Sequence, residues 1–73
     1  MPTYHIEVHT TDGQVATGPD ETVTATEFDA LRAELRDALK NGTGYIEVCF
    51  ADDSIGMFPS LAVTAAYLRV TAP

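Results

Sequence analysis

The first part of the chain alternates apolar and polar side chains with a period of two. Between residues 3 and 10 the apolar positions are Tyr4, Ile6 and Val8. This alternation is typical of a strand that buries one face. Asp12-Gly13 then indicates a tight turn, because glycine adopts positive φ without a Cβ clash. We therefore predict a hairpin whose short return strand, residues 14–17, ends at Gly18-Pro19.

A helical spacing replaces this alternation in the middle of the chain. Apolar residues fall three or four positions apart at Phe28, Leu31, Leu35, Ala38 and Leu39. Thr24 and Glu27 have the spacing of a capping box, and Thr26 offers a second possible cap. Acidic residues lead the segment, Lys40 ends it, and Asn41-Gly42 supplies a stop signal. The pattern predicts one amphipathic helix that starts after one of these caps and runs to about Lys40.

Alternation returns in the second half of the chain. Residues 44–50 and 54–58 predict two strands joined by a tight turn. Pro59 ends the second of these strands, because proline cannot donate to a ladder. We expect a short helical turn from Ser60 and a last strand over residues 67–71.

These elements follow one another in the order β-β-α-β-β-β. One helix can cover one sheet face, so the sequence predicts an α+β fold in which one amphipathic helix packs on one face of a small antiparallel sheet. Residues 1–73 are expected to form a single domain. The expected core consists of the inward apolar side chains Ile6, Val8, Val15, Phe28, Leu31, Leu35, Leu39, Ile46, Val48, Phe50, Ile55, Leu68 and Val70.

The same alternation predicts what the uncovered face of the sheet carries. If the apolar positions of each strand face the helix, the side chains between them face the other way. This face then gathers eight residues: His5, Glu7, His9, Tyr45, Glu47, Cys49, Tyr67 and Arg69. Tyrosine and arginine are enriched at protein interfaces, so we interpret the face as an interface. The alternative is a solvated face on which the aromatic residues have no special role.

Metal binding and catalysis find little support in the residue spacing. His5 and His9 would lie about 13 Å apart on one strand, so they cannot bind one ion. Cys49 and a histidine form the nucleophile–base pair that is available, but the neighbouring acids Glu47 and Asp52 would disfavour the thiolate that must attack. We therefore predict no metal, cofactor or catalytic residue, and we do not expect an enzyme. A small-ligand binder or minor enzyme that uses His5, His9 and Cys49 stays open as an alternative.

Acidic residues outnumber basic ones, with 11 Asp and Glu against 4 Lys and Arg and a net charge of −7. This charge disfavours direct binding to nucleic acid, whose affinity comes largely from phosphate neutralisation. Most of the acidity lies outside the nearly neutral helix, where it indicates either solubility or a basic partner protein. The N-terminus has no signal-peptide pattern, and no apolar run is long enough for a membrane span. Together with a lone cysteine, these features lead us to expect a cytoplasmic protein.

The second half of the chain resembles a group of small bacterial and phage proteins. The residues that carry the resemblance are the segment Gly44-Tyr-Ile-Glu-Val-Cys-Phe-Ala-Asp-Asp-Ser-Ile-Gly-Met-Phe-Pro-Ser60 and the strand Ala66-Tyr67-Leu68-Arg69-Val70. They look like small actinobacterial and actinophage β-β-α-β-β domain proteins of unknown function, over residues 26–71. The resemblance implies an accessory protein of a bacterium or phage, and it implies no activity.

Three functions follow as hypotheses. The leading one is a non-enzymatic protein-interaction module that self-associates as a dimer through the uncovered sheet face, because a chain of 73 residues buries only a small core. The second is an acidic phage or mobile-element inhibitor that binds a basic host protein. The third is the small-ligand binder or minor enzyme that uses the histidines and the cysteine.

Overall fold

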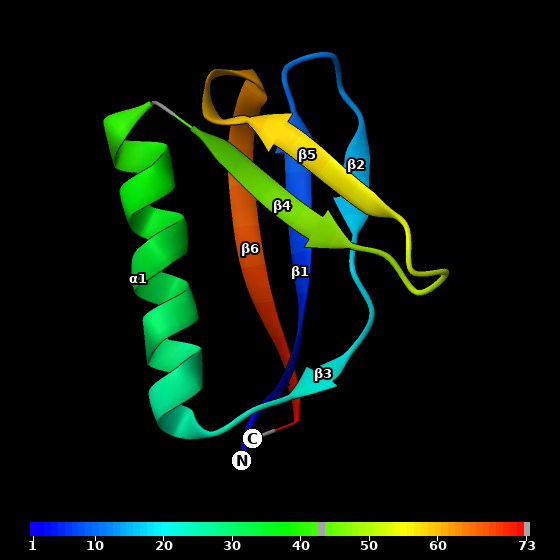
Figure 1. Ribbon diagram of the computed structural model, residues 1–73, viewed down its shortest axis with the longest axis vertical. Coiled ribbons are helices and arrows are strands. Elements are labelled where there is room, and N and C mark those ends of the chain that lie inside the picture. Colours follow the sequence, from blue (N-terminus) through cyan, green and yellow to red (C-terminus); the bar gives the residue numbers. More distant parts are fainter. Residues whose placement is uncertain (43, 73) are drawn as a thin grey trace.

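One helix stands beside two antiparallel sheets in the structure, a computed structural model that describes residues 1–42 and 44–72 (Figure 1). It confirms the α+β class and the expected order of the elements. Strand β1 (Thr3–Thr10) is the central strand of the larger sheet and pairs along its length with β6 (Val63–Ala72). Two short strands, β2 (Val15–Thr17) and β3 (Glu21–Thr22), pair one after the other with the opposite edge of β1.

The smaller sheet is a hairpin of β4 (Tyr45–Cys49) and β5 (Ile55–Pro59) that crosses in front of β1 and β6 (Figure 1). The strands that were expected to form one sheet thus divide into two layers. Alternation defines which side chains of a strand share a face, but it does not define which strands pair. The expected helical turn follows β5 as a 3-10 helix, η1 (Ser60–Ala62).

Strand β6 is longer than the sequence predicts. It starts at Val63 rather than at Tyr67, because Ala65 and Ala66 also pair with β1. Ala66 packs against the core, whereas Ala65, opposite His9, lies on the other face, and two adjacent alanines contribute little to an alternating pattern. As a result, β1 is covered by a partner strand from one end to the other.

Helix α1 (Ala25–Asn41) starts at the first of the two predicted caps. The Thr24 hydroxyl accepts a hydrogen bond from the Glu27 N–H at 3.1 Å, and the Glu27 carboxylate accepts one from the Thr24 N–H at 3.4 Å. These two bonds satisfy donors that the helix itself cannot satisfy. Gly42 ends the helix with a φ of 65°, in the left-handed region that glycine tolerates best. The helix runs alongside β6 (Figure 1).

The core lies where the two sheets face each other. Val8 of β1 and Val48 of β4 are fully buried, and Tyr4 and Ile46 are nearly so. Predicted core residues that pack around this centre and are partly buried are Ile6, Leu35, Leu39 and Phe50. Removal of these apolar side chains from water is the main favourable contribution to folding.

Three residues predicted to lie in the core are more than half exposed: Val15, Ile55 and Val70. In β2, Ala16 is the residue opposite Val8, so Val15 faces outward. In β5, Gly56 is the residue opposite Val48, so Ile55 faces outward as well. A shift of one residue in register moves every side chain of a strand to the other face. Val70 lies near the end of β6 that the hairpin does not cross (Figure 1).

Replacing Thr24 by alanine removes the hydroxyl that caps α1. We expect Thr24→Ala to lower the free energy of unfolding by about 1 kcal/mol. The matched control is Thr26→Ala, because Thr26 is an exposed threonine of the first helical turn. This variant should stay within about 0.5 kcal/mol of the parent. Urea denaturation followed by circular dichroism measures both, and equal losses would contradict the assignment of the cap to Thr24.

Candidate interaction surfaces

The eight residues predicted to share one sheet face lie on two separate faces. Those that point outward from the larger sheet are His5, Glu7, His9, Tyr67 and Arg69. Those that point outward from the hairpin are Tyr45, Glu47 and Cys49. The prediction of one continuous face is wrong, because β4 and β5 form a sheet of their own. Whether either set contacts a partner stays a prediction.

The outer face of the larger sheet is organised around the carboxylate of Glu7. One of its oxygens lies 2.7 Å from His9 Nε2, and the other accepts a hydrogen bond from Arg69 Nε at 3.0 Å. The Arg69 guanidinium stacks over the Tyr67 ring, 4.2 Å from its centre, and the His9 ring meets Tyr67 edge-on. We call these four residues the Glu7 network. Each oxygen of the Glu7 carboxylate thus has a partner within the same face.

The hydrogen bonds within this network also change the ionisation of Glu7. The bond from Arg69, supported by the one to His9, holds the pKa of Glu7 below its ordinary value of 4.5. A carboxyl group with a lowered pKa stabilises the folded state fully above its unfolded pKa, and this stabilisation is lost as pH falls through the folded value. The contribution of Glu7 is therefore complete above about pH 4.5 and declines in more acidic solution.

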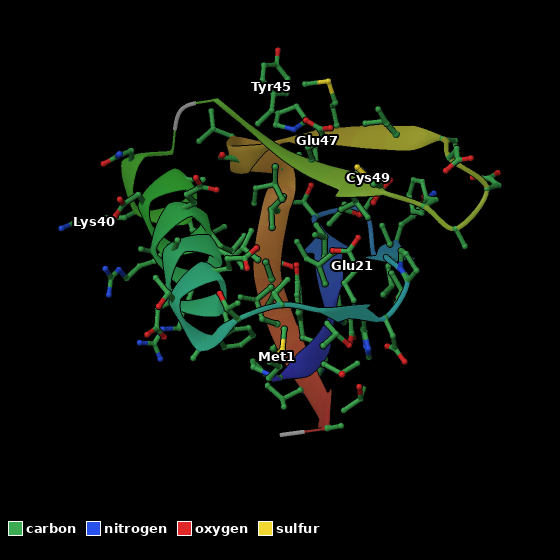
Figure 2. The ribbon with its side chains drawn as sticks, turned by 60° about the horizontal axis from the view of Figure 1, so that its bottom comes forward. Met1, Glu21, Lys40, Tyr45, Glu47 and Cys49 are labelled. Atoms are coloured by element: carbon green, nitrogen blue, oxygen red, sulfur yellow. The ribbon has the colours of Figure 1, made fainter. Side chains whose placement is uncertain are left out.

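The outer face of the hairpin has the opposite character, because it is mostly apolar. The residues that form it are Tyr45, Glu47, Cys49, Ile55 and Met57, and we call them the hairpin face. Tyr45 is 64% exposed, and Ile55 and Met57 are each 59% exposed. Figure 2 shows Tyr45 pointing away from the body of the molecule. The apolar side chains of the hairpin face therefore lie together in water, largely uncovered by the described residues.

Ile55 and Met57 are the surface residues that the sequence prediction missed. A signal for them exists, because β5 reads Ile55-Gly56-Met57-Phe58-Pro59 without a polar side chain. A strand with apolar residues on both faces is typical of a strand covered on both faces. Here the inward face, with Phe58, packs against the core, whereas the outward face is exposed.

The residues proposed for small-ligand or catalytic chemistry do not come together. Cys49 belongs to the hairpin, whereas His5 and His9 belong to β1 in the other sheet. His5 pairs with Asp20 at 3.2 Å, and the Cys49 thiol lies 3.8 Å from a carboxylate oxygen of Glu47. Within residues 1–42 and 44–72, no three His, Cys, Asp or Glu side chains are grouped so that they could hold a metal ion. A cysteine–histidine pair is therefore not assembled in this fold.

Comparisons with protein-family models, curated proteins and solved structures find no match to this chain. The resemblance to actinobacterial and phage proteins therefore stays a prediction. In the part of the chain that the structure describes, the one α-helix is too short and too polar to cross a membrane.

Replacing Arg69 by glutamine removes the main cause of the lowered Glu7 pKa. We expect the pKa of Glu7 to rise toward 4.5 in Arg69→Gln, because its hydrogen bond from the guanidinium is lost. Titration of the side-chain carboxyl carbon by NMR measures this change. The control is Arg36→Gln, which removes an exposed arginine of α1, whereas the network lies on β1 and β6. The network would be disproved if Glu7 titrated alike in both variants and the parent.

Proposed function

We propose that this chain is a non-enzymatic protein-interaction module that self-associates through the hairpin face. The observation that carries the proposal is the exposure of Tyr45, Ile55 and Met57 on one side of a two-stranded sheet. A hairpin alone is marginally stable in water, and it usually needs a third strand or a covering layer. The core supplies a layer on the inner side, and β5 of a second copy would supply the further strand.

The backbone of β5 offers a second feature that favours pairing with another copy. The Phe50 N–H donates a hydrogen bond to the Ser54 carbonyl, and the Ser60 N–H donates one to the Gly44 carbonyl. These two bonds define which residue pairs of the hairpin are hydrogen-bonded and which are not, because the two kinds alternate along the strands. This alternation directs the N–H and C=O groups of Ile55 and Met57 away from β4. In the described residues, β4 is the strand that pairs with β5, so the other edge of β5 is open. Open edges of this kind are templates for strand addition.

Charge decides which edge of the hairpin two copies can share. Strand β5 carries no charged residue, so two β5 strands can meet about a two-fold axis without opposing like charges. Strand β4 carries Glu47 at its centre, and pairing of two β4 strands would bring these carboxylates close together. The β5 side is therefore the favourable one for a chain with a net charge of −7.

The solvent-accessible surface of the folded chain also favours association with a partner. It exposes 4771 Å² of solvent-accessible surface. A compact monomer of 7.8 kDa is expected to expose about 4,400 Å². The Glu7 network is a poorer candidate for contact, because burying its ionised groups would cost desolvation with no new partner for them.

Replacing Met57 by lysine places a charge in the centre of the proposed dimer contact. Because each dimer would contain two copies of the change, we expect Met57→Lys to weaken dimerisation by about tenfold or more. The matched control is Val15→Lys, which adds the same charge at a similarly exposed valine of the larger sheet. Sedimentation velocity at micromolar concentration measures both. Added salt should strengthen the parent dimer by screening repulsion between two acidic chains.

Two experimental outcomes would contradict the proposal. A parent protein that stays monomeric at all concentrations and salt levels would exclude self-association. A dimer that Tyr67→Ala dissociates, but Met57→Lys does not, would move the contact to the outer face of the larger sheet.

A further inference from the structure

An apolar cleft of about 380 Å³ lies between helix α1, strand β4 and the inner face of the larger sheet. Its floor is formed by Tyr4, Ile6 and Leu68 from the sheet, and Leu31 and Leu35 line the helix side. The hairpin crosses only part of the larger sheet (Figure 1), and of the three floor residues Ile6 and Leu68 stay partly exposed, whereas Tyr4 is buried. The volume falls at the lower end of the range for binding sites in proteins.

The third side of the cleft is the open edge of β4. In the hairpin ladder, the backbone N–H and C=O groups of Ile55 and Met57 point away from β4. In the same way, those of Tyr45, Glu47 and Cys49 point away from β5. These three residues line the cleft, although their side chains belong to the hairpin face. In Figure 2, Tyr45 points to the far side of β4. What β4 presents to the cleft is therefore largely a row of backbone N–H and C=O groups.

One end of this row is closed by the connection between β2 and β3. A Cβ placed on Gly18 would lie 3.0 Å from the Ile6 side chain and 3.5 Å from the Cys49 carbonyl oxygen. The connection thus approaches β4 closely at Cys49, and Pro19 lines the cleft beside it. The Tyr45–Glu47 part of the edge stays accessible.

The charge around the cleft has one sign. Of the described residues that line it, Glu21, Glu34 and Glu47 are charged, and none is a lysine, arginine or histidine. The Tyr4 hydroxyl donates a hydrogen bond to Glu21 at 3.3 Å, which holds that carboxylate against the floor. None of the ion pairs formed by the described residues involves Glu21 or Glu34.

The helix separates this acidic cleft from the basic residues of the chain. The cationic residues that line the shallow groove on the other side of α1 are Arg32, Arg36 and Lys40. The remaining base, Arg69, belongs to β6 and pairs with Glu7. Every base of the chain thus lies in a folded helix or strand, so the chain has no free extended basic segment to place in its own cleft.

We infer that the cleft binds an extended basic segment of another protein, which adds to the open edge of β4 as a third strand. Backbone hydrogen bonds to Tyr45 and Glu47 would give affinity, as in other cases of strand addition. Alternate apolar side chains would cover the exposed parts of Ile6 and Leu68, and a lysine or arginine would meet Glu21 or Glu34. This inference does not depend on self-association, which uses the opposite edge of the hairpin.

Titration of ¹⁵N-labelled protein with the peptide acetyl-Lys-Val-Thr-Val-Lys-amide tests the inference. Amide shifts are expected at Tyr45 and Glu47. Two peptides serve as controls: one has glutamate in place of both lysines, and one has the same side chains with methylated nitrogens at the three central residues. Both should bind at least tenfold more weakly, the first through charge repulsion and the second through loss of backbone donors.

Variants of the protein separate charge recognition from nonspecific attraction to an acidic chain. We expect the double change Glu21→Gln and Glu34→Gln to weaken peptide binding by about tenfold. The control is Asp37→Asn, which removes an exposed carboxylate from the same helix outside the cleft and should leave binding unchanged.

Three outcomes would overturn the inference. The first is no binding of any peptide, and the second is equal binding of the methylated peptide. The third is a set of shifts confined to Ile55 and Met57, which would assign the peptide to the self-association edge. A loss of peptide binding with an intact dimer, or the reverse, tells the two proposals apart.

Discussion

The contact between Val8 of β1 and Val48 of β4 holds the two layers of this fold together. Both side chains are fully buried, and the other residues of the core are arranged around them. Helix α1 contributes only partly buried side chains to this centre. A chain with so small a core leaves much apolar surface exposed, and the two-stranded sheet that closes the core exposes Tyr45, Ile55 and Met57. Its outer face and both of its edges are therefore the natural places for contacts with other molecules.

Local patterns predicted most of the elements because their causes are local. The spacing of Thr24 and Glu27 is enough to predict the cap of α1. The alternation of Ile46 and Val48 with polar residues is enough to predict the strand β4. Strand pairing depends on residues far apart in the sequence. No short stretch of sequence could therefore show that β4 and β5 form a sheet separate from the larger one. The same reason explains Val15 and Ile55, whose orientation depends on the register of two hairpins.

The candidate surfaces were predictable only in part. Alternation placed each predicted residue on the outward side of its strand, but it could not show that Cys49 and His9 lie on different sheets. The cleft could not be predicted, because its edge is backbone and its floor is defined by what the hairpin fails to cover. Glu21 and Glu34 looked like ordinary surface acids in the sequence. Their positions beside Tyr4 and Leu31 give them a role that composition alone does not reveal.

The pairing of β1 with β6 has a consequence for how the chain folds. Thr3 pairs with Ala72 and Thr10 with Val63, so the central strand is synthesised first and receives its longest partner last. Loops that long must be closed before the contacts form, which slows folding. Until β6 is made, β2 and β3 pair with one edge of β1 and the hairpin packs on its inner face, but the edge that β6 will take has no partner. Of all its segments, the first strand is thus exposed longest to the risk of pairing with the wrong chain.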